Sequence, residues 1–142
     1  MPIATSRVTD LRDIGPIIDL MAHIPRPVRD LMTKAGTPIP APIKVSALID
    51  TGASASCIRE DIAKSLGLNP VGVQQISTPS TTATCAEYFV ALQLPSMGVI
   101  WEGKFIATPL PGQNIACLIG RDLLSHGVLV YNGQDGSFTF CL

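Results

Sequence analysis

Charged residues are scarce in this sequence, and long apolar runs are absent. Asp, Glu, Lys and Arg together make up 15% of the 142 residues, whereas a typical globular protein has about 25%. Hydrophobic residues make up 46%, and mean hydropathy is +0.37. Pro, Gly, Gln and Ser interrupt the uncharged stretches before any reaches the ~20 residues that a membrane-spanning helix needs. We therefore expect no membrane segment, and we expect an oligomer interface to bury the surplus apolar surface.

The sequence also has no excess of basic residues, no signal-peptide pattern in residues 1–13 and no closely spaced pair of cysteines. The net charge is −1, with Lys and Arg scattered along the chain, which argues against a nucleic-acid-binding protein. Residues 1–13 lack the apolar core of a signal peptide, which predicts a cytoplasmic protein. The cysteines show no CxxC spacing; they are Cys57, Cys85, Cys117 and Cys141. We expect reduced thiols and neither a metal site nor a cofactor.

An apolar strand that ends in a single carboxylate is the most informative stretch. Residues 47–54 read Ala-Leu-Ile-Asp-Thr-Gly-Ala-Ser, so a hydroxyl and a glycine follow Asp50 at once. This arrangement suits a carboxylate held at the floor of a cleft. The motif occurs once, and 142 residues allow one domain but not two packed lobes. One Asp is half of an acid–base pair, so the other half would have to come from a second copy of the chain.

Alternating apolar residues and turn signals predict an all-β fold class, mainly β with two or three short helices. The expected strands cover residues 16–24, 43–49, 71–76, 87–94, 99–107, 115–119, 128–131 and 137–142. The expected helices are a short one within the proline-rich segment 25–42, one along Ile58, Ile62 and Leu66 with Ser56 as N-cap, and one entered from Gly120.

The chain ends and the proline-rich segment carry further expectations. Residues 1–15 read as a polar lead-in, either an arm or a frayed end. Phe138, Phe140 and Leu142 share one strand face, and exposing it would be unfavourable, so we expect burial, against a partner chain in one interpretation. Segment 25–42 has three open roles: extending a dimer contact, recruiting a partner, or covering an edge.

Small residues separate two of the predicted strands. Between strands 71–76 and 87–94 lies a polar stretch of low bulk: Ser77, Thr78, Pro79, Ser80, Thr81, Thr82, Ala83 and Thr84. Two strands joined by such a tip predict a projecting hairpin. An ordinary loop is the alternative.

The order of these parts resembles the retropepsin-like aspartic proteases. The resemblance rests on four features in this order: the strand 43–49, the Asp-Thr-Gly-Ala loop, the hairpin around 77–84, and the run Leu118-Ile119-Gly120-Arg121-Asp122-Leu123-Leu124. This homodimeric family includes retroviral proteases and single-lobed bacterial and retroelement relatives. The resemblance spans residues 16–142, with 25–42 as an insertion. It implies a closed acid-protease-like barrel with one lobe per chain and a homodimeric active site.

The resemblance also implies a role for each matching residue. Asp50 matches the catalytic Asp, and Thr51 matches the residue whose hydroxyl bonds across the dimer axis. Gly52 matches the position where backbone approaches substrate, and Ala53 and Ser54 complete the loop. The turn that supports this loop matches Leu118, Ile119 and Gly120, followed by Arg121 and Asp122. Residues 77–84 match the flap that closes over substrate.

Two departures from the family pattern affect these roles. Arg121 matches an arginine that pairs in retroviral members with an Asp just after the loop, but Ser54 stands there. The ion pair is therefore rerouted, to Asp122 or Asp61, or is absent. The flap tip contains no glycine, whereas retroviral tips are glycine-rich, and this leaves flap motion open.

The resulting function is an aspartic endopeptidase that acts on extended peptides. Two carboxylates within about 3 Å of each other cannot both be ionised, so they share a proton. One then activates a water as base while the other acts as acid, without a metal or cofactor. Ala53 lacks a hydroxyl that would stabilise the carboxylate, which predicts a milder working pH than that of a strongly acid-acting relative.

Other functions stay open beside this one. A dimer with this fold that has lost turnover would bind peptides between flap and floor. A hydrolase using Cys57 as nucleophile, with His23 or His126, is the other class. Asp50-Thr51-Gly52 is also compatible with a plain turn at the end of a strand.

Overall fold

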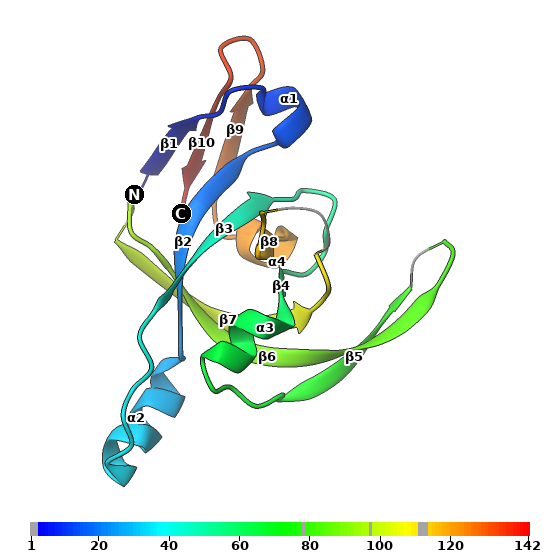
Figure 1. The fold of residues 1–142 in the computed structure, drawn as a ribbon. Helices are drawn as coiled ribbons and strands as arrows, with labels where there is room; N and C mark the ends of the chain where they lie inside the picture. The colour runs from blue at the N-terminus through cyan, green and yellow to red at the C-terminus, as the bar shows by residue number, and fades with distance from the viewer. Residues whose placement is uncertain (1–2, 78, 97, 111–113) are drawn as a thin grey trace.

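The computed structural model describes residues 3–77, 79–96, 98–110 and 114–142. Six strands in this part of the chain close into a ring: β2 (Ile17–His23), β3 (Ile43–Ile49), β8 (Cys117–Ile119), β4 (Cys57–Ile58), β7 (Val99–Ala107) and β6 (Thr82–Leu94). Pairing of β2 with β6 closes the ring, while β5 (Gly72–Ser77) pairs with β6 alone. The predicted mainly-β class and closed barrel are confirmed (Figure 1).

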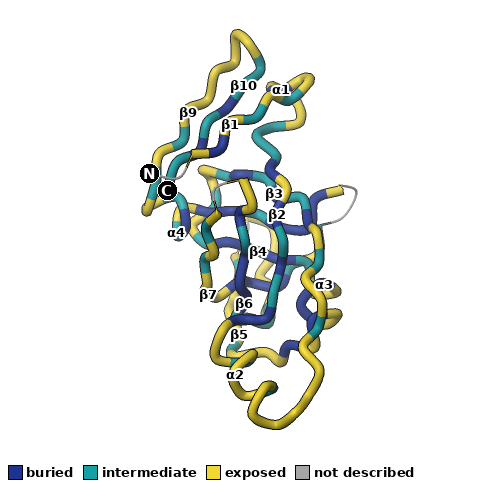
Figure 2. The backbone as a smooth tube through the Cα atoms, turned by 90° about the vertical axis from the view of Figure 1, so that its left-hand side faces the viewer, coloured by how far each residue is buried: buried dark blue, intermediate teal, exposed yellow. Residues whose placement is uncertain are grey.

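Alternation along β3 shows how the barrel presents Asp50. Val45, Ala47 and Ile49 are buried in the core, so the intervening residues, Ser46 and Leu48, face the other way. Figure 2 shows the same alternation of buried and less buried segments along the barrel strands. Asp50 continues the outward set just past the strand end, which turns its side chain away from the core.

The two ends of the chain meet in a second, three-stranded sheet with the order β1 (Ile3–Arg7), β10 (Ser137–Cys141), β9 (Val128–Asn132). Residues 3–7, read from sequence as part of a polar lead-in, are therefore a paired strand. Phe138 and Phe140 are 1% and 0% exposed within this chain, and Leu142 packs partly buried against the same core. The predicted burial of the C-terminal apolar face is confirmed, and the chain's own core supplies it.

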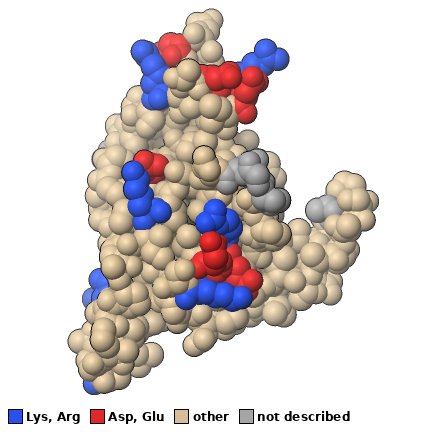
Figure 3. Space-filling model, viewed as in Figure 1, with Lys and Arg blue, Asp and Glu red and all other residues tan. Residues whose placement is uncertain are grey.

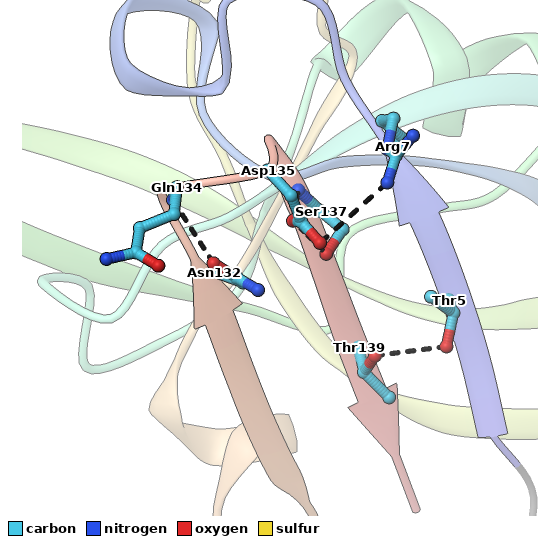
Figure 4. A network of polar contacts seen from close by, with 7 residues as sticks. All are labelled: Thr5, Arg7, Asn132, Gln134, Asp135, Ser137 and Thr139. Carbon is cyan, nitrogen blue, oxygen red and sulfur yellow. Dashed lines mark hydrogen bonds and ion pairs between the residues drawn. The ribbon is translucent and has the colours of Figure 1, made fainter.

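Polar contacts fasten this terminal sheet (Figure 4). The Thr5 and Thr139 hydroxyls lie 3.0 Å apart at a register where the two residues face each other across the strands. Arg7 Nη2 lies 3.7 Å from an Asp135 carboxylate oxygen, and Asp135 accepts hydrogen bonds from Ser137. The N-terminal strand is thus bonded to the turn of the C-terminal hairpin.

Four short helices are present in the described ranges: α1 (Leu11–Ile14), α2 (Arg26–Ala35), α3 (Glu60–Ser65) and α4 (Arg121–Leu124). The short α1 was not expected from sequence. The expected helix of segment 25–42 is α2, which has Pro27 in its first turn and ends at Gly36 with φ +67°. No helix in the described ranges is long and apolar enough to cross a membrane.

The predicted start of the helix after the Asp50 loop was wrong. Ile58 belongs to strand β4, which pairs with both β7 and β8, and α3 starts two residues later at Glu60. Arg59, not Ser56, occupies the N-cap position. The spacing of Ile58, Ile62 and Leu66 had placed Ile58 in the helix. A single buried apolar residue fits a strand as well as it fits a helix, so the spacing alone could not separate the two.

The predicted hairpin exists, with a shorter tip than expected. Strand β5 continues to Ser77 and β6 begins at Thr82, so Thr82, Ala83 and Thr84 are strand residues. Thr78 lies outside the described residues. Threonine is well suited to a strand, and this explains why the ladder extends into a stretch that composition assigned to the tip.

Candidate active site

Strand β8 and the loop's own backbone hold the Asp50 loop in place. The Asp50 amide donates to the Ile119 carbonyl at 2.9 Å, which continues the parallel pairing of β3 with β8. The half-buried Asp50 carboxylate accepts the Gly52 amide at 2.9 Å, and the Ala53 amide donates to the Asp50 carbonyl at 3.2 Å. A Cβ on Gly52 would lie 3.1 Å from the Asp50 Oδ1 atom. Glycine therefore lets the backbone bind the carboxylate without crowding it.

Arg121 holds the same loop from the β8–α4 side. Its amide donates to the Ala53 carbonyl and its Nη1 donates to the Thr51 carbonyl, both at 2.8 Å. Among the described residues it forms an ion pair with neither of the acids suggested from sequence: Asp61 pairs with Arg59, and Asp122 binds Ser56. With Ser54 in place of a carboxylate, the guanidinium binds the loop backbone instead.

A buried serine, which the sequence analysis did not assign to the site, joins the two segments. Ser56 is 0% exposed; its hydroxyl donates to Asp122 Oδ1 at 2.7 Å and accepts the Gly120 amide at 2.9 Å. The Ser56 amide donates to Asp122 Oδ2 at 2.9 Å. A Cβ on Gly120 would lie 2.6 Å from the Ala55 carbonyl carbon, so only glycine permits this approach. The sequence feature that could have indicated this network is Asp122, which directly follows the Ile-Gly-Arg run.

Cys57 lies beside this network without the features of a nucleophile. Burial raises the pKa of its thiol above the ordinary value, with a smaller opposing effect from the Thr108 hydroxyl. The negative charges of Asp122 and Asp50 raise the pKa further. The His23 imidazole is hydrogen-bonded to Gln93 at 2.8 Å. The structure therefore gives no support to a Cys57–His23 pair, because an activated thiol has a lowered pKa.

No metal-binding cluster of His, Cys, Asp or Glu occurs in the described part of the chain. His126, the other histidine considered from sequence, is exposed beyond α4.

The hairpin of β5 and β6 projects from the barrel as an arm (Figures 1 and 3). The Ser77 and Thr82 hydroxyls lie 3.4 Å apart at the strand ends next to the tip. Figure 3 shows a recess between this arm and the body of the molecule. An arm with an exposed, polar tip is able to lie along a ligand bound in that recess.

A hollow of about 490 Å³ lies along the strand face that leads to Asp50. Leu48 and Ser46 of β3 line it from the outward face described above. The remaining lining residues are Asp13, Ile14, Ile17, Asn114 and Ile115. Because Leu48 is two residues from Asp50 on the same face, a ligand at the carboxylate could place one apolar side chain here.

Together, a closed β-barrel, a carboxylate on a backbone-braced Asp-Thr-Gly loop and a projecting hairpin define a single-lobed, retropepsin-like fold. The chain belongs to the gag-polyprotein putative aspartyl protease family, whose model matches residues 42–126. The resemblance stated from sequence is thereby confirmed.

One solved structure supports the fold, and a second is more distantly similar. A retropepsin-like aspartic protease from Rickettsia conorii is 16% identical, with a TM-score of 0.54 over 97% of this chain and 90% of that chain. The simian foamy virus (mac) protease is 19% identical, with a TM-score of 0.44 over 73% of this chain and 88% of that chain. No curated protein gives a significant match.

Proposed function

We propose that this chain is an aspartic endopeptidase whose active site forms when two copies each supply Asp50. The observation that carries the proposal is the half-buried Asp50 carboxylate, held by the Gly52 amide on an Asp-Thr-Gly loop that the sequence contains once. Membership of an aspartyl protease family supports the same chemistry. A cytoplasmic location stays a prediction from sequence.

In the assembled site the two carboxylates share one proton, because two such groups about 3 Å apart cannot both be ionised. The ionised carboxylate takes a proton from a water, whose oxygen bonds to the peptide carbonyl carbon. The protonated carboxyl donates its proton toward the carbonyl oxygen. When the C–N bond breaks, a proton passes to the leaving nitrogen, which yields a free acid and a free amine. None of these steps needs a metal or a cofactor.

An extended peptide with apolar side chains is the substrate that the surroundings favour. The peptide would lie as an added strand between the β5–β6 arm and the floor around Asp50, held by backbone hydrogen bonds. Ile14, Ile17 and Leu48 give the neighbouring hollow apolar walls. A residue next to the scissile bond would place its side chain there.

The second candidate is a dimer of the same fold that binds peptides without cutting them. Two observations favour it: Ser54 replaces an acid, so that Arg121 bonds only to backbone carbonyls in this loop, and the described tip residues include no glycine. The Asp50 loop geometry favours the enzyme.

The deciding experiment compares wild type with Asp50→Asn on a diverse peptide library between about pH 4 and 7. We expect cleavage by wild type alone, rising faster than linearly with enzyme concentration at low dose, and inhibition by a statine-type transition-state analogue. Sedimentation checks that the variant stays folded and associated. Equal cleavage by both proteins, blocked by an alkylating agent, would remove Asp50 from the chemistry. A folded dimer that cleaves nothing would identify the peptide-binding module.

A further inference from the structure

The segment between α2 and β3 has a sequence that restricts its backbone. Residues 37–42 read Thr-Pro-Ile-Pro-Ala-Pro, so each of them either is a proline or directly precedes one. Proline holds φ at about −65°, and the residue before a proline is pushed into the extended region. The whole segment therefore favours the polyproline II conformation, an extended helix without internal hydrogen bonds.

The burial of this segment agrees with that conformation. Polyproline II has about three residues per turn, so residues three apart lie along one edge. Ile43 packs partly buried against the core, and Pro40, three residues earlier, is also partly buried. The residues on the two other edges are all exposed: Pro38, Ala41, Ile39 and Pro42. Segment 37–42 thus presents apolar side chains to solvent, and Ile39 is 46% exposed.

Both ends of segment 37–42 are held by the fold. The Thr37 amide donates to the Met32 carbonyl at 2.9 Å, at the end of α2. Ile43 begins β3 and pairs there with Ala22 of β2. Between these ends, residues 38–42 make no backbone hydrogen bond to any described residue. A segment that is already extended and held loses little conformational entropy on binding, which favours its use as a ligand.

Segment 37–42 lies away from the Asp50 loop. It runs beside α2 at one end of the molecule (Figure 1), and Figure 2 shows the α2 end largely exposed. It precedes β3, whereas Asp50 follows β3, and β3 has seven residues. At about 3.3 Å per residue, the strand separates the two by roughly 23 Å. A partner bound to segment 37–42 would therefore leave Asp50 uncovered.

A positive charge lies on one side of the segment. Lys34, in the last turn of α2, is exposed and forms no ion pair with a described residue. On the other side, Lys44 lies 3.2 Å from an Asp19 carboxylate oxygen, which compensates its charge. The uncompensated charge thus precedes the prolines. An acidic side chain at the matching end of a partner's groove would complement Lys34 and set the direction of binding.

We propose that segment 37–42 is a docking site for a partner protein whose groove is lined by aromatic side chains and has an acid at one end. Domains of the SH3, WW and EVH1 classes bind extended proline-rich segments in aromatic-lined grooves. Pairing with a sheet edge is disfavoured, because a proline at every second position removes the amides that a β-ladder needs. The proposal goes beyond the proposed function, since it does not involve Asp50.

The test measures binding of the full-length chain to a panel of purified SH3, WW and EVH1 domains by surface plasmon resonance. We expect wild type to bind at least one domain. For that domain, Ile39→Glu should raise Kd at least about tenfold, because it would bring a charge into an apolar groove. Pro42→Ala should raise Kd at least about fivefold, the usual effect of removing a contacting anchor. Circular dichroism checks that each variant is folded.

The matched control is Pro70→Ala, which removes an exposed proline before β5, outside the segment. It should bind as wild type does. Ile39→Glu keeps all three prolines, so it tests the segment even if Pro42→Ala disturbs the fold. Lys34→Ala should weaken binding and reduce its dependence on salt, because a charge pair is lost. An unchanged salt dependence would overturn the acidic end of the groove.

Weaker binding by Ile39→Glu and Pro42→Ala, with Pro70→Ala unchanged, supports the proposal. A wild type that binds no domain of the panel, or binding that Ile39→Glu and Pro42→Ala leave unchanged, overturns it. Failure of the proposed function is a separate outcome. Asp50→Asn should bind the domain with the wild-type Kd whether or not it cleaves peptides.

Discussion

Ser56 shows how one side chain can join two parts of a site that are far apart in the chain. Its hydroxyl and amide bind Asp122, and its hydroxyl also receives the Gly120 amide. From sequence, Ser56 was taken for a helix cap, because a serine before an apolar period is typical of that position. The cap interpretation could not include an acid 66 residues away.

Replacing Ser56 should therefore destabilise the protein. Ser56→Ala leaves the Gly120 amide and one Asp122 oxygen without this partner in a buried place, which we expect to cost about 1–3 kcal/mol. Urea unfolding measures the loss. Ser54→Ala is the control, because Ser54 is exposed and its replacement should change stability by less than about 0.5 kcal/mol. Equal effects of the two substitutions would contradict the bridging role of Ser56.

Helix α2 is the element for which the sequence left the most roles open. Val28 and Met32 pack against the core, whereas Leu31 is 68% exposed. Figure 1 shows α2 at the end of the molecule opposite the terminal sheet. The three roles named for segment 25–42, extending a dimer contact, recruiting a partner or covering an edge, therefore stay predictions.

Leu31→Lys tests the dimer-contact role of segment 25–42. Leu31 is exposed on α2, which lies near the start of β3, whereas Asp50 follows the end of β3 (Figure 1). A contact that joins two Asp50 loops would lie away from α2, so we expect the dimer dissociation constant to stay within about twofold of wild type, a change below the usual effect of a buried interface residue. Sedimentation equilibrium at several concentrations gives the constant. A dissociation constant raised by about tenfold or more would instead assign α2 to the interface.

The working pH is a property of the assembled molecule. Ala53 offers no hydroxyl to the carboxylate beside it, so the dyad should act at milder pH than a strongly acid-acting relative. We expect the cleavage profile to peak above about pH 3, since a hydrogen bond to the charged form is what would move it lower. A peak below that value would contradict the argument.

Unfolding at acid pH must be distinguished from the pH dependence of cleavage. A hydrogen bond from Arg59 lowers the pKa of Asp61, and hydrogen bonds from Ser137 lower the pKa of Asp135. A lowered folded-state pKa stabilises the protein above the ordinary carboxyl pKa, and this stability is lost as the pH falls through the lowered value. The Asp61 and Asp135 side chains are 64% and 44% exposed, so solvent screens both carboxylates and each contributes little to stability. Circular dichroism across the same pH range distinguishes the two effects.

Most of the correct predictions came from patterns among residues that are close together in the sequence. Alternation along residues 43–49 and 99–107 matches β3 and β7, and Gly36 ends α2 as expected. The Asp-Thr-Gly run indicated the family, which the family model confirms over residues 42–126. These features depend on local backbone preference and on which face of a strand is apolar, and both are written in neighbouring residues.

Contacts between distant segments required the folded structure. The β2–β6 closure, the terminal sheet that includes residues 3–7, and the bonds from Arg121 and Ser56 join positions far apart in the chain. A local pattern cannot state which strand a given strand will pair with, or which carbonyl an arginine will reach. Those choices follow from closing the barrel around one core, because only then do the Asp50 loop and Ser56 come within hydrogen-bonding distance of residues 119–122.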